Sequence, residues 1–243
     1  MADSQPSSES DPHAPVDGES TPAAGPLGKK SELPLGLPQP AVGRLSLYFR
    51  ELHRLIETGV TSVNSRQLGR LVDVSPAVVR RDLSALGTIG RRGVGYDVQR
   101  LVDRIGVVLG SGTEWNVVLI GVGSLGDALL RYRGFQRLGF QLSGAFDNSP
   151  RRIGTTIAGV TVLDAAVMDD FLVQKPAQLA ILAVPADVAG DIADRLVRGG
   201  VSGILNFAPT TIKLPPRVAI VNVDLASELQ RLVFAVQSNK SPP

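Results

Sequence analysis

Hydrophobic residues recur three and four positions apart, the spacing of a helix, in the first half of the chain. The first such run comprises Leu45, Tyr48, Phe49, Leu52, Leu55 and Ile56. A second, short helix is predicted over 65–72. A third follows Ser75 and Pro76, which suit a cap and a first helical position, and runs to about Leu86. A fourth is predicted from Asp97 to about Leu109, and the four glycines of residues 87–96 favour a hairpin between the last two helices.

After Gly110-Ser111-Gly112 the pattern changes to short apolar runs that alternate with helical ones. Strands are predicted over 116–120, 141–146, 159–162, 178–184, 203–206 and 218–221. Helices are predicted over about 124–132, 164–172 and 186–198, with a last helix over about 224–238. This alternation predicts an α/β fold with a Rossmann-like, doubly wound parallel sheet.

Charge is spread unevenly along the 243 residues, although the net charge is only +2. Residues 1–40 carry six acidic residues against two lysines and hold eight of the seventeen prolines, which predicts a disordered tail that acts as a spacer. Residues 41–112 carry eleven arginines against six acidic residues, whereas residues 113–243 are nearly neutral. The basic segment points to a polyanionic partner.

Several classes of protein are excluded by what the sequence lacks. It has no cysteine and only two histidines, His13 and His53, so we expect neither a disulfide framework nor a metal site nor a histidine-centred catalytic triad. No apolar run approaches the roughly 18 residues of a membrane span, and the first thirty residues do not resemble a signal peptide. We therefore expect a soluble cytoplasmic protein with no membrane partner.

Three short helices followed by a glycine-rich hairpin are typical of a winged helix-turn-helix, whose third helix enters the major groove of DNA. The exposed N-terminal positions of that helix are predicted to be Ser75, Val78, Arg80 and Arg81. Arginine can bind guanine edges and phosphates through two hydrogen bonds at once. Arg91 and Arg92 are predicted to lie at the tip of the wing, beside a minor groove. Each arginine could simply be solvated, but the combination favours DNA binding.

One acidic residue, Asp82, lies within the predicted DNA-reading helix, directly after Arg81. A carboxylate beside phosphates is expected to stabilise the helix through a partner in the protein. We therefore do not count it among the DNA contacts.

The stretch NVVLIGVGSLGDALL combines a strand, a glycine-rich turn and the start of a helix. In the Gly121-x-Gly123-x-x-Gly126 motif the first glycine permits a tight turn, the second lets a diphosphate approach, and the third lets helix and strand pack closely. Free N–H groups at the helix start attract the phosphates. The predicted cofactor-binding residues are Gly121, Val122, Gly123, Ser124, Leu125, Gly126 and Asp147.

Asp147 decides the expected cofactor. It stands 21 residues after Gly126, at the end of the second strand, where a carboxylate accepts hydrogen bonds from ribose hydroxyls and repels a 2′-phosphate. NAD(H) is therefore favoured over NADP(H). Arg151 and Arg152 could accommodate a 2′-phosphate, but we expect them to be solvated on a loop or to contact the cofactor phosphates.

Catalytic groups are scarce around this motif. Residues 113–243 contain no histidine, their one tyrosine is Tyr132, and no lysine forms a Tyr-x-x-x-Lys pair with it. A hydride-transferring enzyme usually positions such a proton donor near the nicotinamide. We therefore expect a protein that senses its cofactor and is not an enzyme. The alternatives are an NAD-dependent oxidoreductase with a helical dimerisation domain, and a sensor of another nucleotide such as coenzyme A or NADPH.

These motifs, in this order, resemble the Rex family of redox-sensing transcriptional repressors. The resemblance covers residues 41 to about 237 and is carried by LSLYFREL (45–52), SPAVVRRDLSALGTIGRRGVGYDV (75–98), VLIGVGSLGDAL (118–129), YRGF (132–135), GAFDNSPRRIG (144–154), GILNFAPT (203–210) and VNVDLASELQRL (221–232). It implies a DNA-binding domain over 41–112, an NAD(H)-binding domain over 113–223, and a terminal helix with its tail over 224–243 that is exchanged between subunits.

The resemblance also implies a function. Rex-like proteins are homodimers that bind a palindromic operator of respiratory and fermentative genes, release it when NADH binds, and retain it with NAD⁺. The family's coupling residues fall on Arg50, Tyr132 and Asp224, with the aspartate exchanging between the other two. The chain departs from the family pattern at Arg81, where lysine is frequent, and at Ala85-Leu86 and Leu225, where an aromatic residue can occur.

The terminal helix supports a partner independently of the resemblance. Its apolar stripe consists of Leu225, Leu229, Leu232, Val233 and Val236, widened by Phe234. A stripe of this size needs a groove to cover it. The groove belongs either to the helix's own domain or to a partner subunit, and the resemblance favours the partner.

Overall fold

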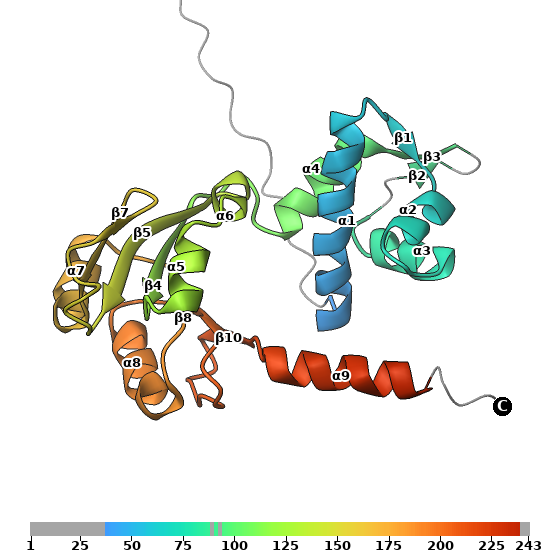
Figure 1. Ribbon diagram of the computed structural model, residues 1–243. Helices are drawn as coiled ribbons and strands as arrows, with labels where there is room; N and C mark the ends of the chain where they lie inside the picture. Colours follow the sequence, from blue (N-terminus) through green and yellow to red (C-terminus); the bar gives the residue numbers. More distant parts are fainter. Residues whose placement is uncertain (1–36, 88–89, 92–93, 239–243) are drawn as a thin grey trace, which may run out of the picture.

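The computed structural model describes residues 37–87, 90–91 and 94–238 of the chain (Figure 1). Within these ranges the chain forms an N-terminal helical unit, then a unit built on one large sheet, and then a final helix (Figure 1). The first unit consists of α1 (Gln39–Glu57), α2 (Ser65–Leu71), α3 (Pro76–Ser84) and α4 (Val98–Val108). All four helices were predicted from the spacing of apolar residues.

The helical unit has its own core, to which each helix contributes its apolar face. The fully buried side chains include Leu45, Tyr48 and Leu52 of α1, Leu68 of α2, Val79 and Leu83 of α3, and Leu101 and Ile105 of α4. Because these residues come from helices far apart in sequence, the core fixes α3 against α1, α2 and α4.

Side chains cap the short helices of this unit. Asn64 Oδ1 accepts the N–H groups of Arg66 and Gln67 at 3.0 and 2.9 Å, and Gln67 Oε1 accepts the N–H of Asn64 at 2.8 Å. Ser75 Oγ accepts the N–H of Val78 at 3.3 Å, which confirms Ser75 as the cap of α3. A seven-residue helix such as α2 depends on its cap and on packing, since its length alone gives little stability.

A small antiparallel sheet in the order β1-β3-β2 completes the unit. Its strands are β1 (Ser62–Val63), β2 (Gly90–Arg91) and β3 (Gly95–Asp97). Gly90 pairs with Tyr96 and Arg91 with Gly95, as the predicted hairpin requires. The two-residue strand β1 was not predicted, because it is too short to show alternation.

The second unit is a seven-stranded sheet in the order β10-β9-β8-β4-β5-β7-β6. Its strands are β4 (Trp115–Ile120), β5 (Phe140–Asp147), β6 (Thr156–Ile157), β7 (Val160–Asp164), β8 (Leu179–Leu182), β9 (Gly203–Asn206) and β10 (Ala219–Asn222). All neighbouring pairs are parallel except β6 with β7. Counted along the chain, the six parallel strands have the order 3-2-1-4-5-6, the doubly wound Rossmann arrangement.

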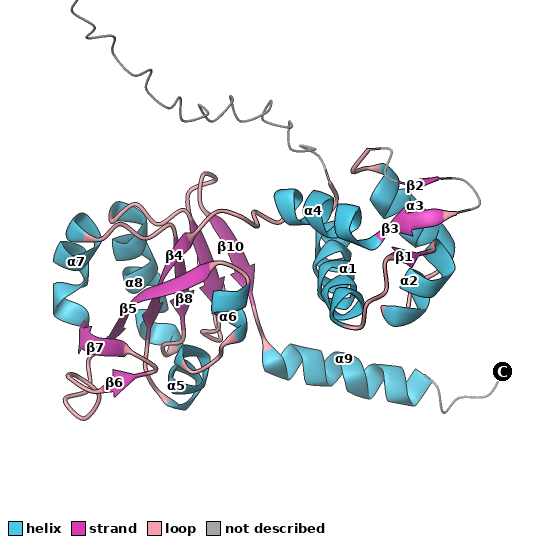
Figure 2. Cartoon of the chain, turned by 90° about the horizontal axis from the view of Figure 1, so that it is seen from above, coloured by secondary structure: helices cyan, strands magenta, loops and turns pink. Residues whose placement is uncertain are grey.

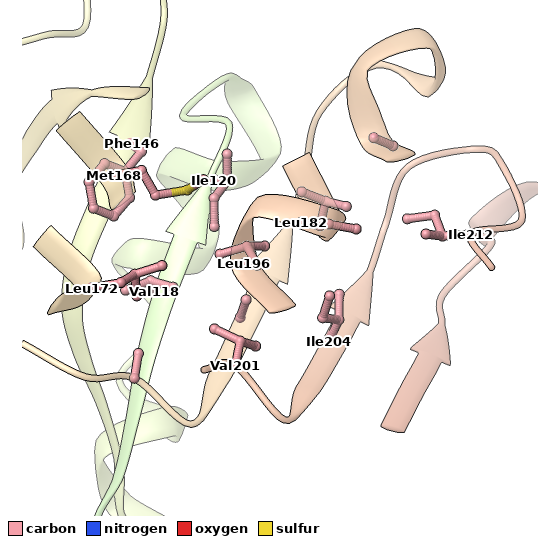
Figure 3. Packing of buried hydrophobic residues seen from close by; sticks show 14 of the residues in the cluster. Val118, Ile120, Phe146, Met168, Leu172, Leu182, Leu196, Val201, Ile204 and Ile212 are labelled. Carbon is pink, nitrogen blue, oxygen red and sulfur yellow. The ribbon is translucent and has the colours of Figure 1, made fainter. Parts of the chain in front are cut away.

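Helices cover both faces of this sheet, and residues of β4 alternate between them. Val118 and Ile120 point toward α7 (Met168–Gln174) and α8 (Ala186–Arg198), where Met168, Leu172 and Leu196 pack (Figure 3). Val117 and Leu119 point to the other face, which is covered by α5 (Ser124–Leu130) and α6 (Gly134–Arg137). Burial on both faces explains the near-continuous apolar run of this strand.

Three details of the sheet unit differ from the prediction. The helix α6 and the edge strand β6 were not expected. The helix predicted over 164–172 begins too early, because β7 continues to Asp164, whose carboxylate accepts the N–H of Ala166 at 2.8 Å. A 3₁₀ turn over Ala165–Val167 follows, and α7 begins only at Met168.

The final helix α9 (Leu225–Ser238) extends away from the sheet unit (Figures 1 and 2). None of its residues is buried, and Leu225, Leu229, Leu232, Val233 and Phe234 are between 55% and 72% exposed. Packing on its own domain, one of the two alternatives, is therefore not observed. A groove on a partner stays a prediction. Among the described residues, no helix combines the length and the apolar character needed to cross a membrane.

Candidate nucleotide and nucleic-acid sites

The turn that follows β4 leaves no room for a side chain at its first and third glycines. Gly121 has a φ of +92°, and a β-carbon there would overlap the carbonyl oxygen of Ala183, which follows β8. A β-carbon on Gly126 would overlap the carbonyl oxygen of Gly121, because α5 packs directly against the turn. These two glycines are therefore required by the fold itself.

Gly123 is glycine for a different reason. A β-carbon at Gly123 would have no atom within 4 Å, so the protein leaves the space above it open. Gly123 is also the residue before α5, and no side chain caps this helix. Open space beside uncapped N–H groups fits a diphosphate, which needs close approach to the backbone. Ser124 and Leu125 form the exposed start of α5, and Val122 is buried.

Asp147, the last residue of β5, has a role within the protein that the sequence did not reveal. Its Oδ2 accepts the N–H of Val122 at 2.6 Å, and its Oδ1 accepts the N–H of Ser149 at 2.7 Å. The carboxylate therefore braces the glycine-rich turn. Each oxygen retains a further lone pair, so the predicted ribose contact is compatible with this arrangement and stays a prediction.

Arg152, on the loop after β5, is already paired with an acidic residue. Its Nη1 lies 3.1 Å from Asp127 Oδ2, and Arg131 Nε lies 2.6 Å from Asp127 Oδ1. The hydrogen bond from Arg131, together with the charge of both arginines, holds the pKa of the Asp127 carboxyl below its ordinary value. Arg152 therefore ties the loop to α5, a role not among those considered from the sequence, whereas Arg151 is exposed.

Sequence reasoning missed Asn206, a buried polar residue at the end of β9. Its Nδ2 donates to the carbonyl of Thr210 at 3.0 Å and to Asn222 Oδ1 at 2.9 Å, and its Oδ1 accepts the N–H of Ala208 at 3.0 Å. It therefore joins the ends of β9 and β10 at the sheet edge where the glycine-rich turn also lies. The available signal was an asparagine that ends an apolar strand.

The exposed face of α3 carries Arg80 and Arg81 with Ala77 and Ser84. Arg80 Nη1 donates to Ser65 Oγ at 3.2 Å, so this arginine leans toward the start of α2. Ser75 is exposed, as predicted, whereas Val78 is half-buried, so its predicted exposure is corrected. Its contact with DNA stays a prediction.

Asp82 lies on the opposite face of α3 and is 3% exposed. Arg44 Nε and Nη2 donate to its two oxygens at 2.6 and 2.8 Å, and the Tyr48 hydroxyl donates to Oδ2 at 3.0 Å. Burial and the bond to Asp82 raise the pKa of the Tyr48 phenol. The expectation that Asp82 has a partner in the protein is confirmed, and the cluster fastens α3 to α1.

The two wing arginines are only partly described. Arg91 belongs to β2, which places its backbone beside the hairpin turn. Arg92 lies outside the described residues. Both stay predictions as DNA contacts.

The three predicted coupling residues each have a local partner. Arg50 Nε lies 3.0 Å from Glu51 Oε1. The exposed Tyr132 ring packs edge-on against Phe135, with 5.1 Å between the ring centroids. Asp224 Oδ2 accepts the Ser227 hydroxyl at 2.6 Å, and this bond lowers the pKa of the Asp224 carboxyl. Within the described part of this single chain, no hydrogen bond joins Arg50, Tyr132 and Asp224.

Comparison with known protein families finds a match in each of the two units. Residues 36–84 match the family "Putative DNA-binding protein N-terminus", and residues 113–210 match the family "CoA binding domain". The redox-sensing transcriptional repressor Rex of Rhodopirellula baltica is 61% identical over 202 residues, which cover 83% of this chain and 85% of that protein. The Rex repressor of Desulfitobacterium hafniense is 42% identical over 207 residues, covering 85% of this chain and 99% of that one.

Solved structures of a Rex-family repressor, RSP, share this fold. RSP in complex with β-NAD⁺ and operator DNA has a TM-score of 0.79 at 34% identity and covers 84% of this chain and 94% of that one. RSP in complex with β-NADH has a TM-score of 0.76 at 33% identity, covering 84% and 96%. The relatives are repressors, which confirms the expectation that the Rossmann-like unit is not that of an enzyme. The chain belongs to the Rex family of redox-sensing transcriptional repressors.

Proposed function

We propose that this chain is a cytoplasmic homodimer that binds a palindromic operator of respiratory and fermentative genes and leaves it when NADH binds. The observation that carries the proposal is the likeness to RSP over 84% of the chain, because the RSP complexes contain operator DNA with NAD⁺ in one case and NADH in another. One fold therefore accepts both ligands. Residues 41–112 would contact DNA, residues 113–223 the nucleotide, and residues 224–243 the partner subunit.

The DNA contact is assigned to Ser75, Arg80 and Arg81, with Arg91 and Arg92 on the wing. Exposure of Arg80 and Arg81 on one face of α3 supports the assignment, since side chains on a single helix face reach the same groove. The Asp82 cluster holds that helix in place without presenting its negative charge to phosphate.

The nucleotide contact is assigned to residues 121–126 and Asp147. The open space above Gly123 and the uncapped start of α5 support binding of a diphosphate. The carboxylate at the end of β5 supports NAD(H) over NADP(H), because it would repel a 2′-phosphate. When bound, the nicotinamide carries the redox state as the presence or absence of a hydride.

Coupling between the two sites is assigned to Arg50, Tyr132 and Asp224. Support comes from the exposure of all three residues and from their partners, which lie only one to three positions away in the chain. A ligand shifts such an equilibrium only by its difference in affinity for the two states. NADH must therefore bind the DNA-free dimer more tightly than the DNA-bound one.

Operator binding measured with and without NADH tests the proposal. An operator selected from a random duplex pool should bind in NAD⁺ and be released by NADH at saturating concentration. Unchanged operator affinity in NADH would sink the mechanism.

The match to the CoA binding domain family favours one further candidate ligand. Calorimetric titration of NADH, NADPH and coenzyme A against the same protein separates the candidates. NADH should bind most tightly, and a tighter coenzyme A complex would replace NADH in the proposal.

A further inference from the structure

A cavity of about 530 Å³ lies between the starts of α2 and α3, on the surface of the helical unit. Arg66 and Arg80 line it together with the hydroxyl-bearing Ser65 and Ser75, and none of its lining residues is acidic. A concave surface that carries two positive charges attracts an anion more strongly than an isolated surface arginine does. The sequence predicts a general DNA-binding role for Arg80 and none for Arg66.

The geometry of Arg80 sets it apart from Arg81. Arg80 reaches fifteen positions back along the chain to Ser65 Oγ, at 3.2 Å, which turns its guanidinium over the cavity. Ser65 is neutral, so the charge of Arg80 is not compensated, and four of the five guanidinium N–H donors stay available. Arg81 lies one position further around α3 and does not line the cavity.

The arginines of α1 differ from the cavity pair, because each of the three has a carboxylate partner. Arg44 pairs with Asp82, and Arg50 and Arg54 pair with Glu51, all on or against α1. Over residues 37–87, 90–91 and 94–238, neither Arg66 nor Arg80 pairs with a carboxylate. Arg70, Arg81, Arg100 and Arg104 have no carboxylate partner among the described residues either, so Arg66 and Arg80 are distinguished by lining one cavity together.

The N-terminal ends of α2 and α3 do not by themselves attract an anion to the cavity. The N–H groups of Arg66 and Gln67 already donate to Asn64, and that of Val78 donates to Ser75. The binding capacity of the cavity therefore comes from its two side-chain charges. Two guanidinium groups that face one small volume fit an anion with several oxygens, and a phosphodiester is such an anion.

We infer that this cavity holds one backbone phosphate of the operator, bound jointly by Arg66 and Arg80. The inference rests on the proposed DNA binding and assigns different tasks to adjacent arginines. Arg80 fixes the position of the protein on the DNA without reading sequence, and Arg81 on the outward face of α3 reads bases. The exposed face of α3 then carries a single arginine for sequence readout.

The salt dependence of DNA binding tests the inference, because its slope counts the phosphates that a protein neutralises. Affinities of the full-length chain and of Arg66→Gln, Arg80→Gln and the double variant would be measured on the selected operator and on a scrambled duplex, from low to physiological salt. Each single variant should weaken both duplexes by the same factor, about fivefold to tenfold.

The double variant is decisive. If both arginines bind one phosphate in each subunit of the homodimer, the double variant should lower the slope by about 1.8, the value for two phosphates. A fall of about 3.6, the value for four phosphates, would overturn the shared site. An unchanged slope would also overturn it.

Arg81→Gln and Arg100→Gln provide matched controls with the same loss of charge. Arg81→Gln should reduce the ratio of operator to scrambled affinity, and an equal reduction by Arg80→Gln would contradict the division of tasks. Arg100, on α4 and outside the cavity, should leave the slope unchanged.

Two further measurements distinguish a DNA phosphate site from a site for free phosphate and from a failure of the proposed function. Inorganic phosphate at millimolar concentration, at constant ionic strength, should not displace the duplex, and displacement would assign the cavity to free phosphate. If the unaltered chain bound neither duplex, the proposed function itself would fail. If only the phosphate site were wrong, the unaltered chain would still bind DNA, and the Arg66 and Arg80 variants would bind it with the same affinity.

Discussion

The two units of this protein present their chemistry in opposite ways. The helical unit presents side chains, because Arg80 and Arg81 are exposed on α3. The acidic residue of that helix, Asp82, is buried on its opposite face. The sheet unit presents backbone groups, because its turn is built from Gly121, Gly123 and Gly126. Its nearby Arg152 is paired with Asp127.

The difference follows from the shapes of the ligands that the two units are proposed to bind. A DNA groove is wide, so side chains must reach into it, whereas a diphosphate is recognised by N–H groups that it can touch only where side chains are absent. Removal of a side chain should therefore impair the first site, and addition of one should impair the second.

The largest expected effect comes from the buried acid of the helical unit. Asp82→Ala leaves Arg44 and Tyr48 without their partner and should lower the free energy of unfolding by about 3 kcal/mol, the low end for a broken buried pair. Urea unfolding followed by circular dichroism measures the loss. Trp115, the one tryptophan, lies at the start of β4 and its ring N–H donates to the carbonyl of Gly110, so its fluorescence reports the junction between the two units.

Tyr48→Phe is the matched control for Asp82→Ala, since it removes one hydrogen bond to the carboxylate, keeps the ion pair with Arg44, and should cost about 1.5 kcal/mol. NADH affinity should be unchanged in both variants. If Asp82→Ala weakened NADH binding as strongly as it weakened DNA binding, the two units would not be energetically separate.

Added methyl groups test the sheet unit. Gly126→Ala places a β-carbon against the Gly121 carbonyl and should lower stability by about 2 kcal/mol, with loss of nucleotide binding. Gly123→Ala meets no protein atom, so stability should stay within about 0.5 kcal/mol of the original while NADH affinity falls at least about tenfold. Equal behaviour of the two variants in calorimetry and urea unfolding would show that the open space is not the binding site.

A smaller effect is expected at Asp147. Asp147→Asn replaces one acceptor oxygen by a donor that faces an N–H group, so the turn loses one of two bonds and NADH affinity should fall about tenfold, or 1.4 kcal/mol. The preference for NADH over NADPH should shrink at the same time. Titration of both nucleotides measures this, and an unchanged preference would separate Asp147 from the ribose.

The smallest effect concerns the exposed ion pairs of Asp127. Its lowered pKa means that the ionised form is favoured by folding, so its contribution is complete above the ordinary aspartate pKa of about 3.9 and is lost as pH falls through the lowered value. Asp127→Asn should lower the melting temperature slightly at neutral pH and have no effect in acid. A difference that grew toward low pH would contradict the assigned direction.

The order of helices and strands could be predicted because each element is long enough to show its period. The stripe of α1 and the turn residues Ser75 and Pro76 located the helical unit, and the glycine spacing located the turn after β4. The elements that were missed, β1, α6 and β6, have two to four residues and are stabilised only by their neighbours in space.

The sequence indicated which kinds of residue the candidate sites contain, but it did not show which residues contact one another. The glycines lie where expected, and Asp82 has its partner. The bonds of Asp147 to Val122 and Ser149, the pairing of Arg152 and the network of Asn206 each join residues that are adjacent only after folding. The same limit hid Arg66, whose proposed role depends on a cavity that two separate helices form.

The short connection between β10 and α9 gives the terminal helix the properties of a lever. Only Val223 and Asp224 separate the two elements, and the N–H of Val223 is bound to the carbonyl of Asn206 at 2.8 Å. A helix of 14 residues is about 21 Å long, so a tilt of about 5° at its base moves its far end by about 2 Å. A small displacement at the end of β10, which leaves the hydrogen bonds there intact, is thereby magnified along α9. The displacement at the far end of the helix is then large enough to change the packing of a side chain.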